Sequence, residues 1–195
     1  MALRSRRSFL LFGAGDAVLW ADETRGKAPL ASVSYPDKPL RQFVPLPASV
    51  TSRQKFMRKC VGCFKCLQSC PRHVLRISDS AGHFLRPEMD FRHGWCYSEC
   101  SLCAKACPTG ALGVPLTAEE KLKKKAGLAV WNRSKCLLQK GEKCNACMRH
   151  CPVGAISHAL DGAVVIDAEK CIGCGACENH CPARPTTAIY VEGLK

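Results

Sequence analysis

The spacing of the 16 cysteines constrains this chain more than any other feature, because they fall into four groups of four. The first and fourth groups follow the pattern C-x2-C-x2-C-x3-C-P without deviation. The second opens with a gap of three residues and the third with a gap of seven, but both end in C-x2-C-x3-C-P. The groups are Cys60, Cys63, Cys66 and Cys70; Cys96, Cys100, Cys103 and Cys107; Cys136, Cys144, Cys147 and Cys151; and Cys171, Cys174, Cys177 and Cys181.

This spacing is the run that binds a [4Fe–4S] cluster in bacterial ferredoxins. Three thiolates two residues apart line a tight loop around three irons of a cube, and the fourth cysteine binds the cluster of a paired group. The proline that follows prevents the chain from continuing as a regular element. Because the four runs use every cysteine, the sequence predicts four [4Fe–4S] clusters as its cofactors.

Other cysteine chemistries fit the spacing poorly. Structural zinc sites use two separated pairs of ligands rather than triplets with a trailing Cys-Pro. Disulfides between cysteines so close in sequence have poor geometry, and a redox C-x-x-C motif would need one exposed pair in a βαβ setting. His150 and His180 precede group-closing cysteines, but each predicted cube already has four thiolates, so neither histidine is expected to bind metal.

The groups can pair in two ways. Sequential pairing joins group one with two and group three with four, whereas nested pairing joins one with four and two with three. We favour the sequential pairing, because a distinct connector separates two similar halves. It assigns the first cluster to Cys60, Cys63, Cys66 and Cys107, the second to Cys96, Cys100, Cys103 and Cys70, the third to Cys136, Cys144, Cys147 and Cys181, and the fourth to Cys171, Cys174, Cys177 and Cys151.

The repeated groups predict an α+β fold of two ferredoxin-like dicluster halves, with small hairpins and short helices around the clusters. In the second half, apolar residues 153–156 and 163–166 flank Asp161-Gly162, a good hairpin signal. The first half repeats this more loosely around a turn at residues 81–82. The expected divisions are a signal region at 1–27, a Pro-rich linker or surface wrap at 28–50, a first half at 51–115, a connecting helix at 116–127 and a second half at 128–195.

The connector carries its own helix signals. Thr117 and Glu120 form a capping box for a helix near residues 118–126, and Gly127 stands where a C-terminal cap belongs. The lysines between residues 121 and 125 suit the negative end of that helix and are expected on a solvated face. A second capping box, at residues 51–54, predicts a short helix that ends near Cys60.

Composition excludes several classes of function. The formal net charge is +13, but an oxidised cube with four thiolates carries about −2, so four cubes leave roughly +5. The basic excess is mostly counter-charge, and nucleic acid is not an expected partner. No run of about 20 apolar residues suggests a membrane span. We find no nucleophile constellation, phosphate-binding loop or flavin motif, so neither catalysis nor a small-molecule substrate is expected.

The N-terminal residues resemble an export signal. Arg6 and Arg7 precede a weakly apolar stretch that runs to Ala21, as in bacterial twin-arginine signals. That route carries folded proteins, which a cluster assembled in the cytoplasm requires. We therefore expect a periplasmic protein. The alternative is a basic tail on a cytoplasmic protein, which Asp16 within the stretch and the lack of an A-x-A site favour.

The order of the groups, with the long gap between Cys136 and Cys144, resembles ferredoxin-type accessory proteins of periplasmic nitrate reductase and methylamine utilisation, the NapF, NapG and MauM types. Residues 87–92 look like the NapF type, and residues 127–130 and 185–191 look like NapG and MauM. The resemblance covers about residues 50–193 and the twin arginines. It implies electron transfer near a membrane quinol oxidoreductase and, for NapF, a role in maturing a molybdoenzyme.

These observations lead to three hypotheses. The favoured one is an electron-transfer polyferredoxin that exchanges single electrons with a redox partner protein, a membrane quinol oxidoreductase subunit or a molybdoenzyme. The alternative is an assembly factor that binds an immature molybdoenzyme, with clusters that are structural or donated. A weaker one is an electron-input subunit of a larger oxidoreductase. Rapid and reversible redox cycling distinguishes the first from the second.

Overall fold

The computed structural model describes residues 36–195, in which the longest helix, α1, has 7 residues. Residues 1–27, where the export signal is predicted, lie outside the described residues. Among residues 36–195, no helix has the length and apolar character needed to cross a membrane. The helices are α1 (Arg53–Lys59), α2 (Lys65–Gln68), α3 (Leu102–Lys105), α4 (Ala118–Lys123), α5 (Ala146–Arg149) and α6 (Ala176–Asn179). The strands are β1 (Leu75–Ile77), β2 (Pro87–Met89), β3 (Gly127–Trp131), β4 (Ile156–His158), β5 (Val164–Ile166) and β6 (Ile189–Gly193).

Four of the helices are single turns that repeat with the cysteine groups. Each of α2, α3, α5 and α6 contains the third cysteine of its group and ends two residues before the fourth. The proline after the fourth cysteine prevents further helix, since it has no N–H to donate. Helix α2 packs against α3, and α5 packs against α6. The helices of groups one and two therefore form one pair, and those of groups three and four form another.

Two antiparallel hairpins confirm the connectors expected within each half. Strands β1 and β2 pair with Leu75 opposite Met89, and β4 and β5 pair with Ile156 opposite Ile166. In the second hairpin Gly162 has a φ of +75°, which only glycine adopts without strain, and the Asp161 carboxylate accepts the Ala163 N–H at 3.0 Å. These local turn signals explain why the sequence predicts both hairpins.

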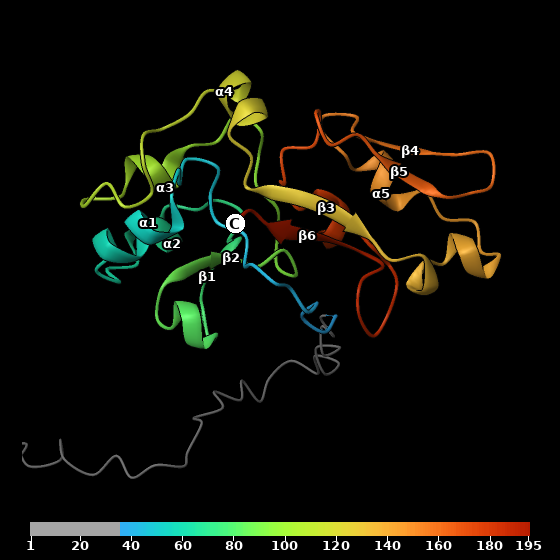
Figure 1. Ribbon diagram of the computed structural model, residues 1–195, viewed down its shortest axis with the longest axis horizontal. Coiled ribbons are helices and arrows are strands. Elements are labelled where there is room, and N and C mark those ends of the chain that lie inside the picture. Colours follow the sequence, from blue (N-terminus) through green and yellow to red (C-terminus); the bar gives the residue numbers. More distant parts are fainter. Residues whose placement is uncertain (1–35) are drawn as a thin grey trace, which may run out of the picture. The chain divides into compact units, whose positions relative to one another are not determined.

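A third antiparallel sheet joins segments far apart in sequence. Strand β3 pairs with β6 along five positions, from Gly127 opposite Gly193 to Trp131 opposite Ile189. In Figure 1 this sheet lies between the parts of the chain that carry α2 and α3 and those that carry α5 and β4. Val191 packs in one hydrophobic core with Phe56 and Phe91, whereas Ile189 packs in the other with Ile156. Strand β6 therefore contributes to both cores.

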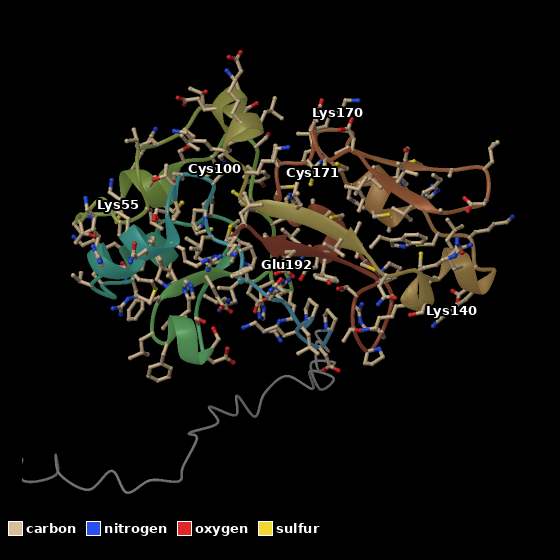
Figure 2. All side chains as sticks on the ribbon, in the orientation of Figure 1. Lys55, Cys100, Lys140, Lys170, Cys171 and Glu192 are labelled. Atoms are coloured by element: carbon tan, nitrogen blue, oxygen red, sulfur yellow. The ribbon has the colours of Figure 1, made fainter. Side chains whose placement is uncertain are left out.

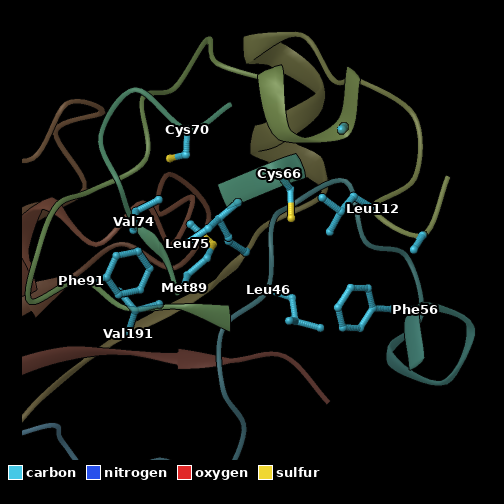
Figure 3. Packing of buried hydrophobic residues seen from close by; sticks show 13 residues of the cluster. Leu46, Phe56, Cys66, Cys70, Val74, Leu75, Met89, Phe91, Leu112 and Val191 are labelled. Carbon is cyan, nitrogen blue, oxygen red and sulfur yellow. The ribbon is translucent and has the colours of Figure 1, made fainter. Parts of the chain in front are cut away.

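The segment before α1 is extended and packs along this arrangement. Leu46 belongs to the first core (Figure 3), and the Pro45 carbonyl accepts the Met89 N–H at 3.0 Å. Two of its cations pair with buried carboxylates: Lys38 with Glu88, and Arg41 with Glu178. The prolines keep this segment out of regular structure, and it packs into the first core and along β2 and β6.

The structure shifts the expected helix boundaries. Helix α4 has the predicted capping box, with reciprocal bonds between Thr117 and Glu120, but it ends at Lys123. Gly127 is not its cap; it is the first residue of β3, because pairing with β6 overrides the local C-cap signal. At α1 the N-cap is Ser52, whose hydroxyl accepts the Lys55 N–H at 3.3 Å, rather than the first residue of the predicted box.

Candidate iron–sulfur centres

The loops of the first and fourth groups have the same unusual backbone at equivalent positions. Gly62 and Gly173, between the first and second cysteines, have φ of +66° and +69°. Phe64 and Gly175, between the second and third, have φ of +56° and +80°. These left-handed residues fold the chain tightly enough for three cysteines to line one loop. The matching conformations explain why these two groups share one spacing.

Thiols from groups one and two converge in two sets. Burial raises the pKa of Cys66 to about 11, with added repulsion from Cys60 and Cys107. Cys63 lies in the same loop and is the one exposed cysteine of the 16. Burial likewise raises the pKa of Cys103 to about 12, and its thiol neighbours in this second set are Cys96, Cys100 and Cys70. In each set, the fourth cysteine of one group therefore lies beside the cysteines of the other.

Groups three and four repeat this exchange. Burial raises the pKa of Cys147 to about 11, and its thiol neighbours are Cys144, Cys181 and Cys136. Burial also raises the pKa of Cys174 to about 11, with repulsion from Cys151 and Cys171. Cys177 has a pKa raised well above the ordinary range, first by burial and then by Cys174 and Cys171. Cysteines of the first half and of the second half thus associate mainly within their own half.

Cavities coincide with two of these sets. One cavity is lined by Cys70 from the first group together with Cys96, Cys100 and Cys103 from the second. Another is lined by Cys136, Cys144 and Cys147 from the third group together with Cys181 from the fourth. Each cavity combines three cysteines of one group with the closing cysteine of its neighbour, which is the arrangement that a shared cube requires.

Backbone N–H groups point at several of the sulfurs. Ala155 donates to Cys151 Sγ at 3.2 Å, and Ala188 donates to Cys181 Sγ at 3.3 Å. Burial raises the pKa of Cys107, but backbone N–H groups of residues 109, 111 and 112 and the Thr109 hydroxyl outweigh it, so that the pKa is lowered. Such donors stabilise thiolate rather than thiol, the form that binds iron.

The donor chemistry fits an iron–sulfur cube. All 16 cysteines are free thiols. Burial and neighbouring thiols raise the pKa of Cys66, Cys103, Cys147 and Cys174, so these become stable thiolates only with a cation beside them. Within residues 36–195, no three His, Cys, Asp or Glu side chains converge tightly enough to hold a single metal ion. A cube places each thiolate on a different iron and therefore needs ligands further apart than a mononuclear site does.

The second and fourth groups meet directly. The Cys96 N–H donates to the Cys174 carbonyl at 2.9 Å, and the Cys96 thiol also contributes to the raised pKa of Cys174. One cavity is lined by Cys96, Cys100 and Cys103 of the second group and by Cys174 of the fourth. In Figure 2, Cys100 and Cys171, one from each of these groups, both lie toward the middle of the described residues. This contact is the junction between the halves.

Close backbone packing fixes the junction. A Cβ on Gly175 would lie 1.9 Å from the Phe91 ring, and one on Gly173 would lie 2.4 Å from the Gly127 nitrogen. The Asn179 side chain also donates to the Phe91 carbonyl at 2.7 Å. Glycine is needed at residues 173 and 175 for space as well as for conformation, a requirement that the group spacing alone does not show.

A buried ion pair lies beside the fourth group, next to its third cysteine. Arg41 pairs with Glu178, which follows Cys177 in α6, and both side chains are nearly fully buried. Burial raises the pKa of Glu178, and Arg41 together with the Val191 N–H, which donates to the carboxylate at 2.8 Å, opposes that rise. Sequence reasoning missed this pair, because its members lie on segments far apart in the chain.

A stack of flat side chains covers one edge of the junction. The rings of His150 and His180 stack with centroids 3.7 Å apart, and Trp95 lies 4.7 Å from His180. The Arg72 guanidinium sits 3.4 Å from the centre of the Trp95 ring. Burial lowers the pKa of His180, and His150 and Arg72 lower it further. Each of the four stacked side chains lies within two residues of a cysteine of a different group, so the stack contacts both halves.

Lys121 departs from its expected solvated position. Its side chain is buried, with 6% of its surface exposed, whereas Lys123 and Lys124 on the same connector are exposed. The ammonium donates to the Tyr97 carbonyl at 2.8 Å and to the Cys100 carbonyl, and lies 3.7 Å from Cys96 Sγ. The sequence of the lysine run does not indicate which lysine side chain is buried, because that depends on how α4 packs against the rest of the protein.

Comparison with known families agrees with this geometry. A model of the 4Fe-4S dicluster domain matches the chain twice, at residues 59–111 and 117–184. Each match contains eight of the cysteines: the first covers groups one and two, and the second covers groups three and four.

Curated relatives fall into two kinds. The methylamine utilization ferredoxin-type protein MauM of Paracoccus denitrificans is 32% identical over 109 residues, 53% of this chain and 47% of its own length. The ferredoxin-type protein NapG of Escherichia coli is 29% identical over 130 residues, 64% of this chain and 52% of its own. NapG of Haemophilus influenzae is 30% identical over 135 residues, 66% of this chain and 46% of its own.

The chain thus spans about half the length of the curated relatives it matches. The two family matches, the paired one-turn helices and the four cysteine groups agree with one another. The chain belongs to the 4Fe-4S dicluster domain family and is a ferredoxin-type protein similar to NapG and MauM.

Proposed function

We propose that this chain is an electron carrier with four [4Fe–4S] clusters, two in each dicluster half. The observation that carries the proposal is the convergence of thiols into sets that each combine cysteines of one group with the closing cysteine of its neighbour. A cluster held by four thiolates supplies reversible one-electron chemistry. The proposal needs no substrate pocket, because the chain's task is to hold, insulate and tune its clusters.

The same sets support sequential over nested pairing. Cys107 approaches Cys66 and Cys70 approaches Cys103, so groups one and two exchange their closing cysteines. Cys181 approaches Cys147 in the same way. Nested pairing would instead require Cys181 beside the first group. We therefore assign the four clusters to the four sets of sequential pairing. They are numbered in order: Cys60, Cys63, Cys66 and Cys107; Cys96, Cys100, Cys103 and Cys70; Cys136, Cys144, Cys147 and Cys181; and Cys171, Cys174, Cys177 and Cys151.

The protein's own residues define a route between the halves. The hydrogen bond from Cys96 to Cys174 brings the second set against the fourth, and Cys147 of the third set lies close enough to Cys177 of the fourth to raise its pKa. Electrons would then pass through the sets in the order one, two, four, three. Trp95 and the stacked histidines cover one edge of this route.

Iron content tests the number of clusters. Protein purified without oxygen should contain about 16 irons and as many acid-labile sulfides per chain, and dithionite reduction followed by reoxidation should restore its visible spectrum. About eight irons per chain, or stoichiometric zinc, would rule out four clusters. Full loading without reversible reduction would favour the assembly-factor alternative over the carrier.

Combined ligand substitutions test the pairing by iron content alone. Cys181→Ala should cost one cluster, and adding Cys144→Ala should cost no more, because sequential pairing puts both on the same cluster. Adding Cys63→Ala to Cys181→Ala should cost a second cluster. Nested pairing reverses the two results, since Cys181 would then share a cluster with Cys63.

We also propose a periplasmic location and a redox partner of the quinol oxidoreductase or molybdoenzyme class. The support is the twin-arginine pattern at Arg6 and Arg7 and the similarity to NapG and MauM. Replacing both arginines with lysine keeps the charge but removes the pair that the export receptor reads. The replacement should retain the protein in the cytoplasm, as measured by cell fractionation. A wild-type protein already confined to the cytoplasm would contradict the proposal.

A further inference from the structure

The buried ammonium of Lys121 has an unusual set of neighbours. It is held by two neutral carbonyls, those of Tyr97 and Cys100, and by the sulfur of Cys96 at 3.7 Å. Within residues 36–195, no carboxylate forms an ion pair with it, and no other charged side chain bonds to a cysteine sulfur. A buried cation needs a counter-charge. The nearest counter-charge available to Lys121 is the thiolate of Cys96 together with the cluster that it would bind.

The charge environment of the second set differs from that of the fourth, which adjoins it. Glu178 places a carboxylate next to Cys177, but Arg41 neutralises it within a buried pair. The second set receives the uncompensated positive charge of Lys121. Burial raises the pKa of Cys96, and the Lys121 ammonium opposes that rise, so the same charge already favours negative charge on this sulfur.

We infer that Lys121 raises the reduction potential of the cluster held by Cys96, Cys100, Cys103 and Cys70 above those of the other three. Reduction adds one electron to the cluster, and a nearby buried cation stabilises that added negative charge more than an exposed one does. Since this set adjoins the fourth at Cys96 and Cys174, the electron would reside at the crossing between the halves. The inference rests on the proposed four-cluster carrier.

Lys121 would therefore be a tuning residue, and its charge is separable from its hydrogen bonds. Lys121→Gln keeps an N–H donor but removes the charge, Lys121→Met removes both, and Lys121→Arg keeps both. Lys123→Gln is the matched control, because Lys123 lies on the same helix and is exposed. If Lys121 only holds the loop carbonyls, Lys121→Gln and Lys121→Arg should behave alike, because both keep an N–H donor. If its charge matters, the two variants should differ, because only Lys121→Arg keeps the charge.

The experiment is a potentiometric titration of fully loaded protein, followed by electron paramagnetic resonance. In the wild type, one of four one-electron waves should lie above the rest, and Cys100→Ser should alter that wave, which assigns it to the second set. Lys121→Gln and Lys121→Met should move the same wave to lower potential. Lys121→Arg and Lys123→Gln should leave it in place.

Two results would overturn the inference. One is a wild type whose four clusters titrate together, a measurement that does not depend on any variant folding. The other is a Lys121→Gln or Lys121→Met protein with 16 irons and unshifted waves. Either result leaves the four-cluster carrier standing, whereas low iron or irreversible reduction in the wild type would refute the carrier itself.

Discussion

At the scale of single residues, the buried pair of Arg41 and Glu178 carries a stability prediction. Arg41→Met leaves a buried carboxylate without its cation, which costs about 3–5 kcal/mol in comparable cases. We expect a lower midpoint of thermal bleaching of the clusters under anaerobic conditions. Lys170→Met, which breaks the exposed pair with Asp167, is the control and should leave stability almost unchanged, because exposed ion pairs contribute little.

The double variant Arg41→Met/Glu178→Leu separates loss of the pair from loss of packing. Removing both charges together should recover part of the stability lost in Arg41→Met, because the unpaired carboxylate is then gone. A double variant that is no more stable than Arg41→Met would show that Arg41 acts through its packing against Phe91 rather than through its charge.

A second residue-scale prediction concerns Asp90. Burial raises its pKa, but hydrogen bonds from the Arg92 guanidinium and amide outweigh it, so the pKa lies below the usual range. A lowered folded-state pKa contributes stability above the unfolded-state value of about 4, and that stability is lost as the pH falls through the folded-state pKa. Asp90→Asn should therefore be destabilising at pH 7, by a margin that shrinks below about pH 4 in parallel chemical unfolding curves. A margin that does not vary with pH would contradict this.

At the scale of elements, the loop that leads into α6 depends on its glycines, and Gly175 has the closest neighbour of the two. Gly175→Ala adds a methyl group 1.9 Å from the Phe91 ring, besides the strain of a positive φ. We expect loss of the fourth cluster or its rapid bleaching, measured as iron per chain. Gly110→Ala is a matched control, since its φ is also positive but nothing lies within 4 Å of the added Cβ. It should cost only the strain, about 1–2 kcal/mol.

A companion variant tests the cause. Gly175→Ala combined with Phe91→Ala makes space for the added methyl group. Recovery of iron relative to Gly175→Ala alone would identify the clash as the defect. No recovery would place the defect in the backbone conformation instead.

The elements also show how far sequence reasoning reaches. The hairpins at β1–β2 and β4–β5 and the capping box of α4 are predictable because their signals, such as Asp161-Gly162 and Thr117 with Glu120, lie within a few residues. The β3–β6 sheet is not predictable in this way, since Gly127 and Gly193 pair across most of the second half. The cysteine spacing predicts which thiols bind iron. The burial of Lys121 is not predictable from local sequence, because it depends on contacts with Tyr97 and Cys100 on a different segment.

At the scale of the whole molecule, cluster binding should supply much of the folding free energy. The described cores include several of the cysteines themselves, among them Cys66, Cys70 and Cys177, so apolar packing and the ligands are not separate. Removing iron with a chelator should therefore unfold residues 51–195 cooperatively. Far-UV circular dichroism and limited proteolysis measure the change. An apoprotein that stays folded and resistant to protease would contradict this prediction.

The contact between Cys96 and Cys174 predicts magnetic coupling across the halves. When all clusters are reduced, spins in the second and fourth sets should broaden each other's resonance. Loss of the second set through Cys103→Ala should narrow the signal of the fourth set in part, because the third set still adjoins the fourth. Loss of the first set through Cys60→Ala should leave it broad. The opposite result would place the first set, not the second, next to the fourth.

The sheet of β3 and β6 also bears on how the chain is made. Val191 and Ile189 of β6 complete both hydrophobic cores, yet the ribosome synthesises them after all 16 cysteines. Neither core is complete until β6 has left the exit tunnel, so thiols of the nascent chain remain open to oxidation until then. We therefore expect iron to be held stably only after this strand has emerged, and a pause in translation upstream of residue 189 would prolong the interval in which the cysteines are unprotected.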